Sequence, residues 1–193
     1  ENTKRLFAYS SIAHLGYLMV VVVAAAQVDN ALSVEATSFY MLAYFIMSLA
    51  GFAVISAISS SVKELDQLSD FRGLFWRNTW LSSVLIIVLF SLAGIPLTAG
   101  FIGKFYIFSI GVEGELWFLL TILIIGSAIG LYYYLRLIYT MMQPPESISN
   151  DPAAMQIPAG VQVVLVTMTI AIIYLGVYPT PMINTLQSLS GAF

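Results

Sequence analysis

Two ionisable side chains, Lys104 and His14, lie inside long apolar stretches of this sequence. Burial disfavours the ammonium form of a lysine, which makes proton exchange feasible, and ionisable groups inside a membrane usually serve a function. Histidine titrates near neutrality and can both donate and accept a hydrogen bond. The two residues therefore indicate a proton relay. The structural alternatives are a lysine that reaches a membrane interface and a neutral histidine that bonds a neighbouring helix.

Hydroxyl groups accompany these two residues. Three of them precede the histidine, and two more lie one helical turn apart in the next apolar stretch. Such side chains can line a hydrated path, although hydrogen bonds between helices are the more ordinary role. The candidates for lining a path are Tyr9, Ser10, Ser11, Tyr44 and Ser48.

The composition predicts that lipid surrounds the chain. Of the 193 residues, 60% are hydrophobic and 9% are charged, whereas soluble domains carry about 25% charged residues. Cysteine is absent from the sequence, which excludes a disulfide framework or a thiolate metal site, and we expect no metal or cofactor on this chain. The net charge of −3 and the scattered basic residues give no pattern typical of nucleic-acid binding.

Five apolar stretches are long enough to cross a membrane as helices. They are residues 6–26, 36–60, 80–112, 116–140 and 161–178. The stretches are continuous rather than alternating, which disfavours a transmembrane barrel. We therefore expect an all-α, polytopic transmembrane helix bundle with residues 1–193 in a single membrane domain. The chain begins at Glu1 with no signal-peptide pattern, so we interpret its start as an internal cut in a longer protein.

The basic residues other than Lys104, which flank the apolar stretches or lie near their ends, predict the orientation of the bundle. With five spans, one side receives Lys4, Arg5, Lys63, Arg72, Arg77 and Arg136. The connectors of the opposite side carry acids, namely Asp29, Glu35, Glu113 and Glu115. Since basic residues favour the cytoplasmic side, the first residue is expected in the cytoplasm and the C-terminus in the periplasm.

The third stretch, which holds Lys104, is too long for a straight span. Its 33 residues would reach about 50 Å as a helix, against a hydrocarbon core of about 30 Å. We expect a helix broken near the bilayer midplane and packed inside the bundle, because non-helical backbone at that depth needs cover. The residues expected to support the break are Gly94, Pro96, Gly100 and Gly103. No carboxylate falls within the five stretches, so a charged partner for the lysine is expected outside this sequence.

Three motifs resemble the antiporter-like membrane subunits of respiratory complex I, the NADH:quinone oxidoreductase. Asn2-Thr-Lys-Arg-Leu-Phe-Ala-Tyr-Ser-Ser-Ile-Ala-His-Leu-Gly-Tyr17 is similar to their helix with a central histidine. Leu92-Ala-Gly-Ile-Pro-Leu-Thr-Ala-Gly-Phe-Ile-Gly-Lys-Phe-Tyr106 resembles the broken helix of their second half-channel. Gly126-Ser-Ala-Ile-Gly-Leu-Tyr-Tyr-Tyr-Leu-Arg136 is the third motif. The resemblance covers nearly the whole chain and implies the last five helices of such a subunit.

The resemblance implies a proton-translocating subunit of an enzyme complex in the bacterial inner membrane. Lys104 would pass protons toward the periplasmic half-channel, and His14 would connect it to a lysine in the missing N-terminal helices. NAD, FMN, Fe–S clusters and quinone are expected on other subunits, so this piece alone is not expected to be catalytic. The implied partners are other membrane subunits of the complex, the missing helices and lipid.

Two further functions fit the same residues. An Mrp-type cation/proton antiporter subunit shares the implied fold, and sodium transport without quinone reduction would identify it. A structural membrane scaffold without transport is the second alternative. Replacement of Lys104 distinguishes the scaffold from either transporter.

Overall fold

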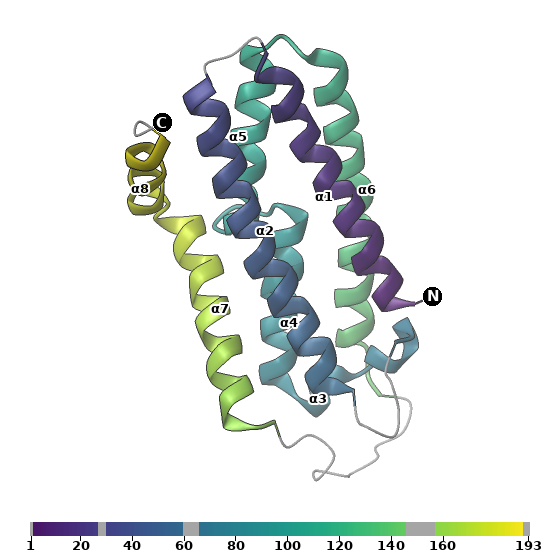
Figure 1. Ribbon diagram of the computed structural model, residues 1–193. Helices are drawn as coiled ribbons and strands as arrows, with labels where there is room; N and C mark the ends of the chain where they lie inside the picture. Colours follow the sequence, from purple (N-terminus) through teal and green to yellow (C-terminus); the bar gives the residue numbers. More distant parts are fainter. Residues whose placement is uncertain (1, 27–29, 60–65, 146–156, 191–193) are drawn as a thin grey trace.

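The chain is built of helices throughout the part that the computed structural model describes, residues 2–26, 30–59, 66–145 and 157–190 (Figure 1). Lys63 and Asp29, used above for the orientation, lie outside this part. The helices are α1 (Thr3–Ala24), α2 (Asn30–Ile58), α3 (Leu74–Arg77), α4 (Thr79–Ala93), α5 (Ala99–Glu113), α6 (Trp117–Met142), α7 (Ala159–Val177) and α8 (Thr180–Ser190), with a 3₁₀ helix, η1, at Leu68–Phe71. The predicted all-α membrane bundle is confirmed.

Four helices are long and apolar enough to cross a membrane by themselves. They comprise Thr3–Ala24, Leu32–Ile58, Trp117–Met142 and Ala159–Val177. The remaining crossing consists of α4 and α5, which follow one another along the bundle in Figure 1 and contain 15 residues each. Each half is about 22 Å long at 1.5 Å per residue. The predicted broken third helix is therefore present. The four long helices and this broken one together are roughly consistent with the predicted count of five spans.

The break begins where Gly94 ends α4 in the left-handed conformation, with φ of 84°. Its backbone N–H donates to the Ser91 carbonyl at 3.0 Å, and the N–H of Ile95 donates to the Phe90 carbonyl at 3.0 Å. This pair of bonds is the common glycine-terminated end of a helix, and only glycine adopts that backbone without strain. Pro96 follows in the non-helical segment. The sequence itself thus stops the helix here.

Gly100 and Gly103 lie inside α5, the half-helix that follows the break. A Cβ atom on Gly100 would come within 1.9 Å of the Ser91 carbonyl oxygen, and one on Gly103 within 2.8 Å of the Tyr40 ring. Both glycines therefore allow close packing, the first against α4 and the second against α2. Their predicted role, support of the break, is compatible with this packing and stays a prediction.

Asparagine side chains begin two of the helices. The Asn2 side-chain oxygen accepts from the Arg5 N–H at 3.0 Å at the start of α1, and Asn78 accepts from the Leu81 N–H at 3.1 Å at the start of α4. These caps satisfy backbone donors that a helix leaves unpaired at its first turn. They fix where α1 begins and where α4, the first half of the broken helix, begins.

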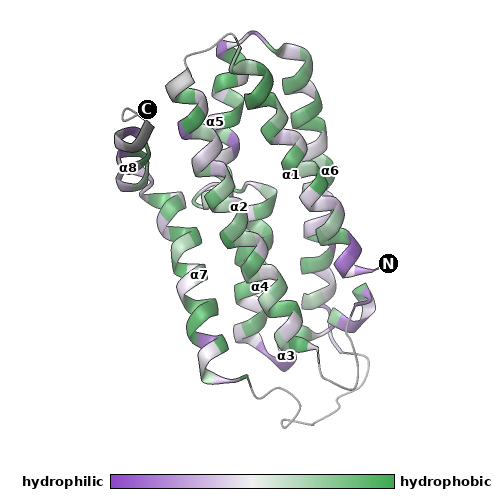
Figure 2. Ribbon diagram, viewed as in Figure 1, coloured by the Kyte–Doolittle hydropathy of each residue, from purple (hydrophilic) through white to green (hydrophobic). Residues whose placement is uncertain are grey.

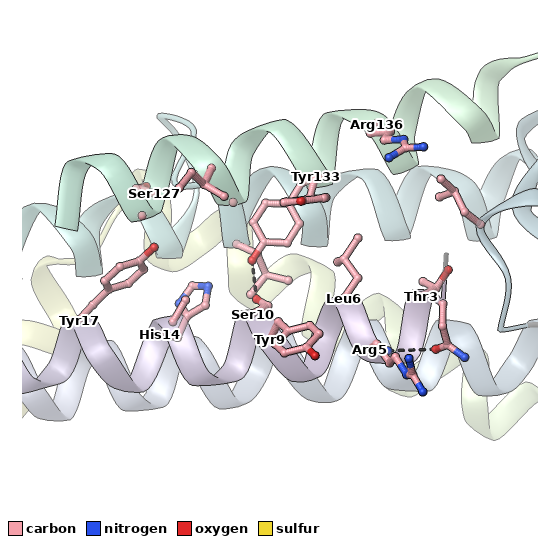
Figure 3. A pocket seen from close by; sticks show the side chains of 18 of the residues that line it. Thr3, Arg5, Leu6, Tyr9, Ser10, His14, Tyr17, Ser127, Tyr133 and Arg136 are labelled. Carbon is pink, nitrogen blue, oxygen red and sulfur yellow. Dashed lines mark hydrogen bonds between the residues drawn. The ribbon is translucent and has the colours of Figure 1, made fainter. Parts of the chain in front are cut away.

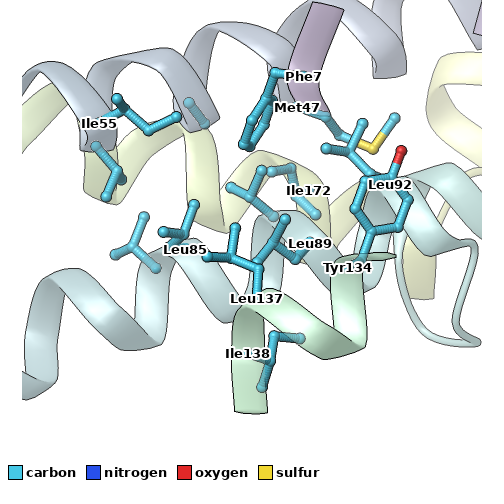
Figure 4. Packing of buried hydrophobic residues seen from close by; sticks show 14 of the residues in the cluster. Phe7, Met47, Ile55, Leu85, Leu89, Leu92, Tyr134, Leu137, Ile138 and Ile172 are labelled. Atoms are coloured by element: carbon cyan, nitrogen blue, oxygen red, sulfur yellow. The ribbon is translucent and has the colours of Figure 1, made fainter. Parts of the chain in front are cut away.

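Helix α2 occupies the middle of the bundle and packs against α1, α4, α5, α7 and α8. Figure 4 shows Met47 of α2 beside Leu92 of α4 in the larger of the two buried clusters. Figure 2 shows apolar residues along most of the length of the helices, with hydrophilic residues concentrated near their ends. Large side chains on the outside of α6, such as Ile122 and Ile125, are more than half exposed. An apolar surface of this kind suits lipid or further membrane helices.

Two elements differ from the expectation at the end of the bundle opposite Arg5. Helix α2 begins at Asn30, so Glu35 is helical and 5% exposed, not part of a connector. The expectation that no carboxylate lies in a spanning helix was therefore wrong, because the helix starts before its apolar pattern does. Helix α8 follows directly after α7, with Pro181 in its first turn, where proline is tolerated. Prolines that end one helix here also begin the next.

Candidate functional site

The side chain of Lys104 ends at the break, against the last carbonyl groups of α4. Its Nζ donates to the carbonyl oxygens of Leu92 and Ala93, each at 2.9 Å, and to Ser127 Oγ of α6 at 2.9 Å. An ammonium group has three N–H donors, so all three are satisfied by uncharged acceptors. The ring of Tyr17 lies 5.5 Å from Nζ on another side.

The carbonyl end of α4 supplies the negative potential that a carboxylate would otherwise provide. The last carbonyls of a helix have no partner within the helix and carry partial negative charge. Here two of them bond the Lys104 ammonium, which stabilises its charge inside the bundle. The uncharged partners of Lys104 therefore lie within this sequence, and the charged partner expected outside it stays a prediction.

Two glycines make this arrangement possible. A Cβ on Gly94 would lie 2.9 Å from Lys104 Cδ and 3.3 Å from its Nζ, so a larger residue would displace the amine. Gly100 brings the first turn of α5 against the last turn of α4, and its N–H donates to Ser91 Oγ at 3.1 Å. The close contact between the two half-helices thus positions Lys104.

His14 lies in the same bundle, 2% exposed, between α1 and α2. Its Nδ1 shares a hydrogen bond of 2.6 Å with the hydroxyl of Tyr40. The rings of Tyr17 and Tyr44 lie with centroids 5.5 and 5.1 Å from the imidazole. The histidine is therefore fixed on one nitrogen by a phenol and enclosed by aromatic rings.

A cavity of about 510 Å³ runs between α1 and α6 and connects these groups with one end of the bundle. Lys104, His14, Tyr17 and Ser127 line its inner part, and Arg5 and Arg136 line its outer part. In Figure 3, Tyr17, His14 and Ser127 gather at one end of the view, and Arg5, Thr3 and Arg136 at the other. The cavity is large enough for several water molecules and has polar groups along its length.

Of the other residues predicted to line a path, some line the cavity and others do not. Tyr9 and Ser10 line the cavity, and Ser10 shares a hydrogen bond with the Tyr134 hydroxyl across it. Ser11 donates instead to the Phe7 carbonyl of its own helix at 3.0 Å. Tyr44 stacks on the histidine ring, and Ser48 is not among the residues that line the cavity. Arg136, which was used to predict the orientation, lies before the last turn of α6 and borders the cavity.

The sequence interpretation did not select several polar residues that the fold brings to the site. They are Tyr17, Tyr40, Ser127 and Tyr134. Ser127 lies within an apolar stretch, between Gly126 and Gly130. Both of these glycines also border the cavity. The position of these polar residues inside apolar stretches could have identified them as candidates. Their partners could not be predicted in this way, because they are 23 to 124 residues away in sequence.

Among the residues that the structure describes, no group of three or more histidine, cysteine, aspartate or glutamate side chains could hold a metal ion. The site is instead made of one amine, one imidazole and several hydroxyl groups. Groups of this kind exchange protons with water and with one another.

The fold and the site together define a class: multi-pass helical membrane proteins that carry ionisable groups beside a broken helix inside the bundle. The family model described as "NADH:quinone oxidoreductase/Mrp antiporter, TM" matches residues 1–130. The chain belongs to this family.

Similar proteins agree with this membership. NADH-quinone oxidoreductase subunit N of Methylococcus capsulatus is 47% identical over 186 residues, which is 95% of this chain and 36% of that protein. A chain of respiratory complex I from Thermus thermophilus superposes with a TM-score of 0.80 at 29% identity, covering 96% of this chain and 40% of that one. The sequence therefore spans somewhat more than a third of the length of these relatives.

A second solved structure has the same fold at lower identity. A chain of the Mrp complex from Dietzia superposes with a TM-score of 0.75 at 14% identity, covering 96% of this chain and 45% of that chain. At this level of identity the likeness concerns the fold only. The two structures show that one architecture occurs in both branches that the family description names.

Proposed function

We propose that this chain is part of a proton-translocating membrane subunit of a bacterial NADH:quinone oxidoreductase, and that Lys104 is its proton-exchanging group. The observation that carries the proposal is the binding of the Lys104 amine by two helix-end carbonyls and one hydroxyl beside a cavity. A scaffold has no need for an amine at this depth, where an apolar residue would avoid the cost of burying a charge. The 47% identity to a subunit N favours the oxidoreductase over the antiporter branch.

The three partners of Lys104 can serve both of its protonation states. The ammonium form donates to Leu92, Ala93 and Ser127. The neutral amine has two N–H donors and one lone pair, so it keeps both carbonyls. The Ser127 hydroxyl can rotate and donate to that lone pair, since a hydroxyl both donates and accepts. The site therefore stays hydrogen-bonded while the proton leaves and returns.

The cavity between α1 and α6 supplies the route to the amine. It reaches from Lys104 to the end that carries Arg5 and Arg136, which the positive-inside rule places in the cytoplasm. We infer that Lys104 takes up protons from the cytoplasmic side through this cavity and releases them toward the periplasm. His14, which borders the same cavity, would connect Lys104 with groups on other helices.

The redox centres would lie outside this chain. In the proposal, other subunits carry NAD, FMN, Fe–S clusters and quinone, and the energy released by their redox reactions drives the movement of protons. The other membrane subunits and the N-terminal helices of the same subunit would cover the α1 and α6 faces that are exposed here. The expected location is the bacterial inner membrane, with the first residue in the cytoplasm and the C-terminus in the periplasm.

The test is replacement of Lys104 by Met in the full-length subunit within the assembled complex. Quinone reduction and proton uptake by membrane vesicles are measured together, and the expected result is loss of pumping that follows from loss of the exchangeable proton. Arginine at this position should not restore it, because guanidinium does not release its proton at accessible pH. Lys4→Met, at the membrane end of α1, serves as the matched control. Normal pumping by an assembled Lys104→Met complex would refute the proposal.

The antiporter alternative is tested in the same vesicles. Sodium flux driven by a proton gradient, without any requirement for quinone reduction, would assign the chain to the Mrp-type branch. Proton pumping that depends on quinone reduction and not on sodium supports the oxidoreductase.

A further inference from the structure

Glu35 is a buried carboxylate on the opposite side of Lys104 from the cavity mouth. It lies near the start of α2, at the end of the bundle away from Arg5 and Arg136 (Figure 1), and is 5% exposed. Burying a carboxylate is unfavourable unless hydrogen bonds compensate for the lost water. The partners of this side chain therefore decide what it can do.

Two uncharged side chains neighbour Glu35. Its Oε2 accepts from Gln187 Nε2 of α8 at 3.0 Å, and the Tyr106 side chain of α5 lies beside the same carboxylate. An amide and a phenol can hold an anion without cancelling its charge, whereas a guanidinium partner would keep the carboxylate ionised. Neither of these two partners carries a charge.

The packing of α2 against α5 places this carboxylate just beyond Lys104. The Tyr40 ring packs at Gly103, next to Lys104, while Glu35 meets Tyr106 two residues further along α5. Glu35 precedes Tyr40 by five residues, about 7.5 Å along the helix axis toward the end opposite Arg5. Gln187, its hydrogen-bond partner on α8, is exposed. The carboxylate thus lies between the amine and that end of the bundle.

We propose that Glu35 is a second proton-exchanging group, which receives protons from Lys104 and releases them on the side away from the cavity mouth. The proposal rests on the proposed function and adds the outward half of the route to it. In the transfer, an N–H bond of the Lys104 ammonium breaks and an O–H bond forms on Glu35 by way of intervening hydroxyl groups or water. The proton then leaves past Gln187, and the carboxylate returns to its anionic form.

The alternative role of Glu35 is purely structural, as the acceptor that fastens α8 to α2 through Gln187. The two roles differ in what each substitution should do. Glu35→Gln keeps an oxygen for both donors but cannot carry a proton. Gln187→Leu removes the link between the helices but leaves the carboxylate and Tyr106 unchanged.

The experiment measures protons pumped per electron in the full-length assembled complex. We expect Glu35→Gln to lower pumping at least fivefold, Glu35→Asp to retain part of it, and Gln187→Leu to cause a smaller loss than Glu35→Gln. Glu113→Gln, the same change at an exposed acid on that side, should pump normally. Normal pumping by Glu35→Gln, or an equal loss in Glu35→Gln and Gln187→Leu, would overturn the inference.

Two comparisons keep the result decisive. If Lys104→Met stops pumping and Glu35→Gln does not, the inference fails while the proposed function stands; if Lys104→Met pumps normally, both fail. Should Glu35→Gln not assemble, infrared difference spectra between low and high pH are recorded on wild type and Glu35→Asp. A carboxylic C=O band that shifts in Glu35→Asp supports the proposal, and an identical band in both proteins contradicts it.

Discussion

Gly100→Ala changes the contact between the two halves of the broken helix without touching Lys104 itself. The new methyl carbon would lie 1.9 Å from the Ser91 carbonyl oxygen and 2.7 Å from its carbon. Both atoms belong to the backbone, so no rotamer change can relieve the overlap. Real Cβ atoms essentially never approach closer than 3.0 Å, and the end of α4 and the start of α5 must therefore separate by about 1 Å.

The size of the effect follows from that displacement. Overpacking a well-packed core destabilises a protein by about 1–3 kcal/mol. The Lys104 bonds to Leu92 and Ala93 are 2.9 Å long, and a shift of about 1 Å would take them beyond hydrogen-bond range. We therefore expect a lower free energy of unfolding and, in the fraction that assembles, a severalfold loss of proton pumping.

The assay combines thermal unfolding of the purified full-length protein in detergent with pumping by the assembled complex. Gly16→Ala on α1 is the matched control, because nothing lies within 4 Å of its added methyl group. Alanine should leave that protein unchanged or stabilise it by up to about 1 kcal/mol through helix propensity. Stability within about 0.5 kcal/mol of wild type together with full pumping in Gly100→Ala would refute the packing argument.

Three further substitutions test separate parts of the account. Ser127→Ala should lower pumping severalfold, because the neutral amine of Lys104 loses its donor, and Ser127→Thr should retain most of it; a proton-uptake assay on vesicles measures both. Tyr40→Phe leaves the buried His14 nitrogen without a partner and should lower the free energy of unfolding by about 1–3 kcal/mol in a denaturation experiment. Asn78→Ala removes the cap of α4 and should cost about 1 kcal/mol in the same measurement, with normal pumping once assembled.

Each of these expectations has a contrary outcome. Equal pumping by wild type and Ser127→Ala would show that the hydroxyl has no part in the exchange. A Tyr40→Phe protein as stable as wild type would mean that the hydrogen bond to His14 contributes nothing. A pumping defect in assembled Asn78→Ala would show that the start of α4 affects the site in a way the structure does not explain.

The sequence predicted the membrane bundle and the broken helix because both depend on local properties. Apolar stretches of sufficient length define spans by themselves, and Gly94 with Pro96 stops a helix whatever surrounds it. Glu35 was misplaced because a helix can begin before its apolar pattern does, with polar residues in its first turns. Helix α8 was missed because Pro179 and Pro181 interrupt the apolar pattern after the fifth stretch and the segment beyond them is short and mixed in character.

The partners within the site could not be predicted in the same way. A lysine in an apolar stretch is visible in the sequence, but its binding by the Leu92 and Ala93 carbonyls depends on how α5 folds back on the end of α4. Tyr40 and Ser127 reach His14 and Lys104 only through the packing of separate helices. Nothing in their local sequence distinguishes these two from other polar residues that merely join helices.

The central claim is that Lys104 serves through a proton that it can release, and chemical rescue of Lys104→Cys tests it most directly. The chain itself contains no cysteine, so the introduced thiol can be modified selectively in a full-length background free of other reactive thiols. Aminoethylation restores a primary amine of nearly the original length, and we predict that it restores pumping. A quaternary ammonium reagent, which adds the charge but no exchangeable proton, should leave pumping absent. Equal recovery with both reagents would contradict the account.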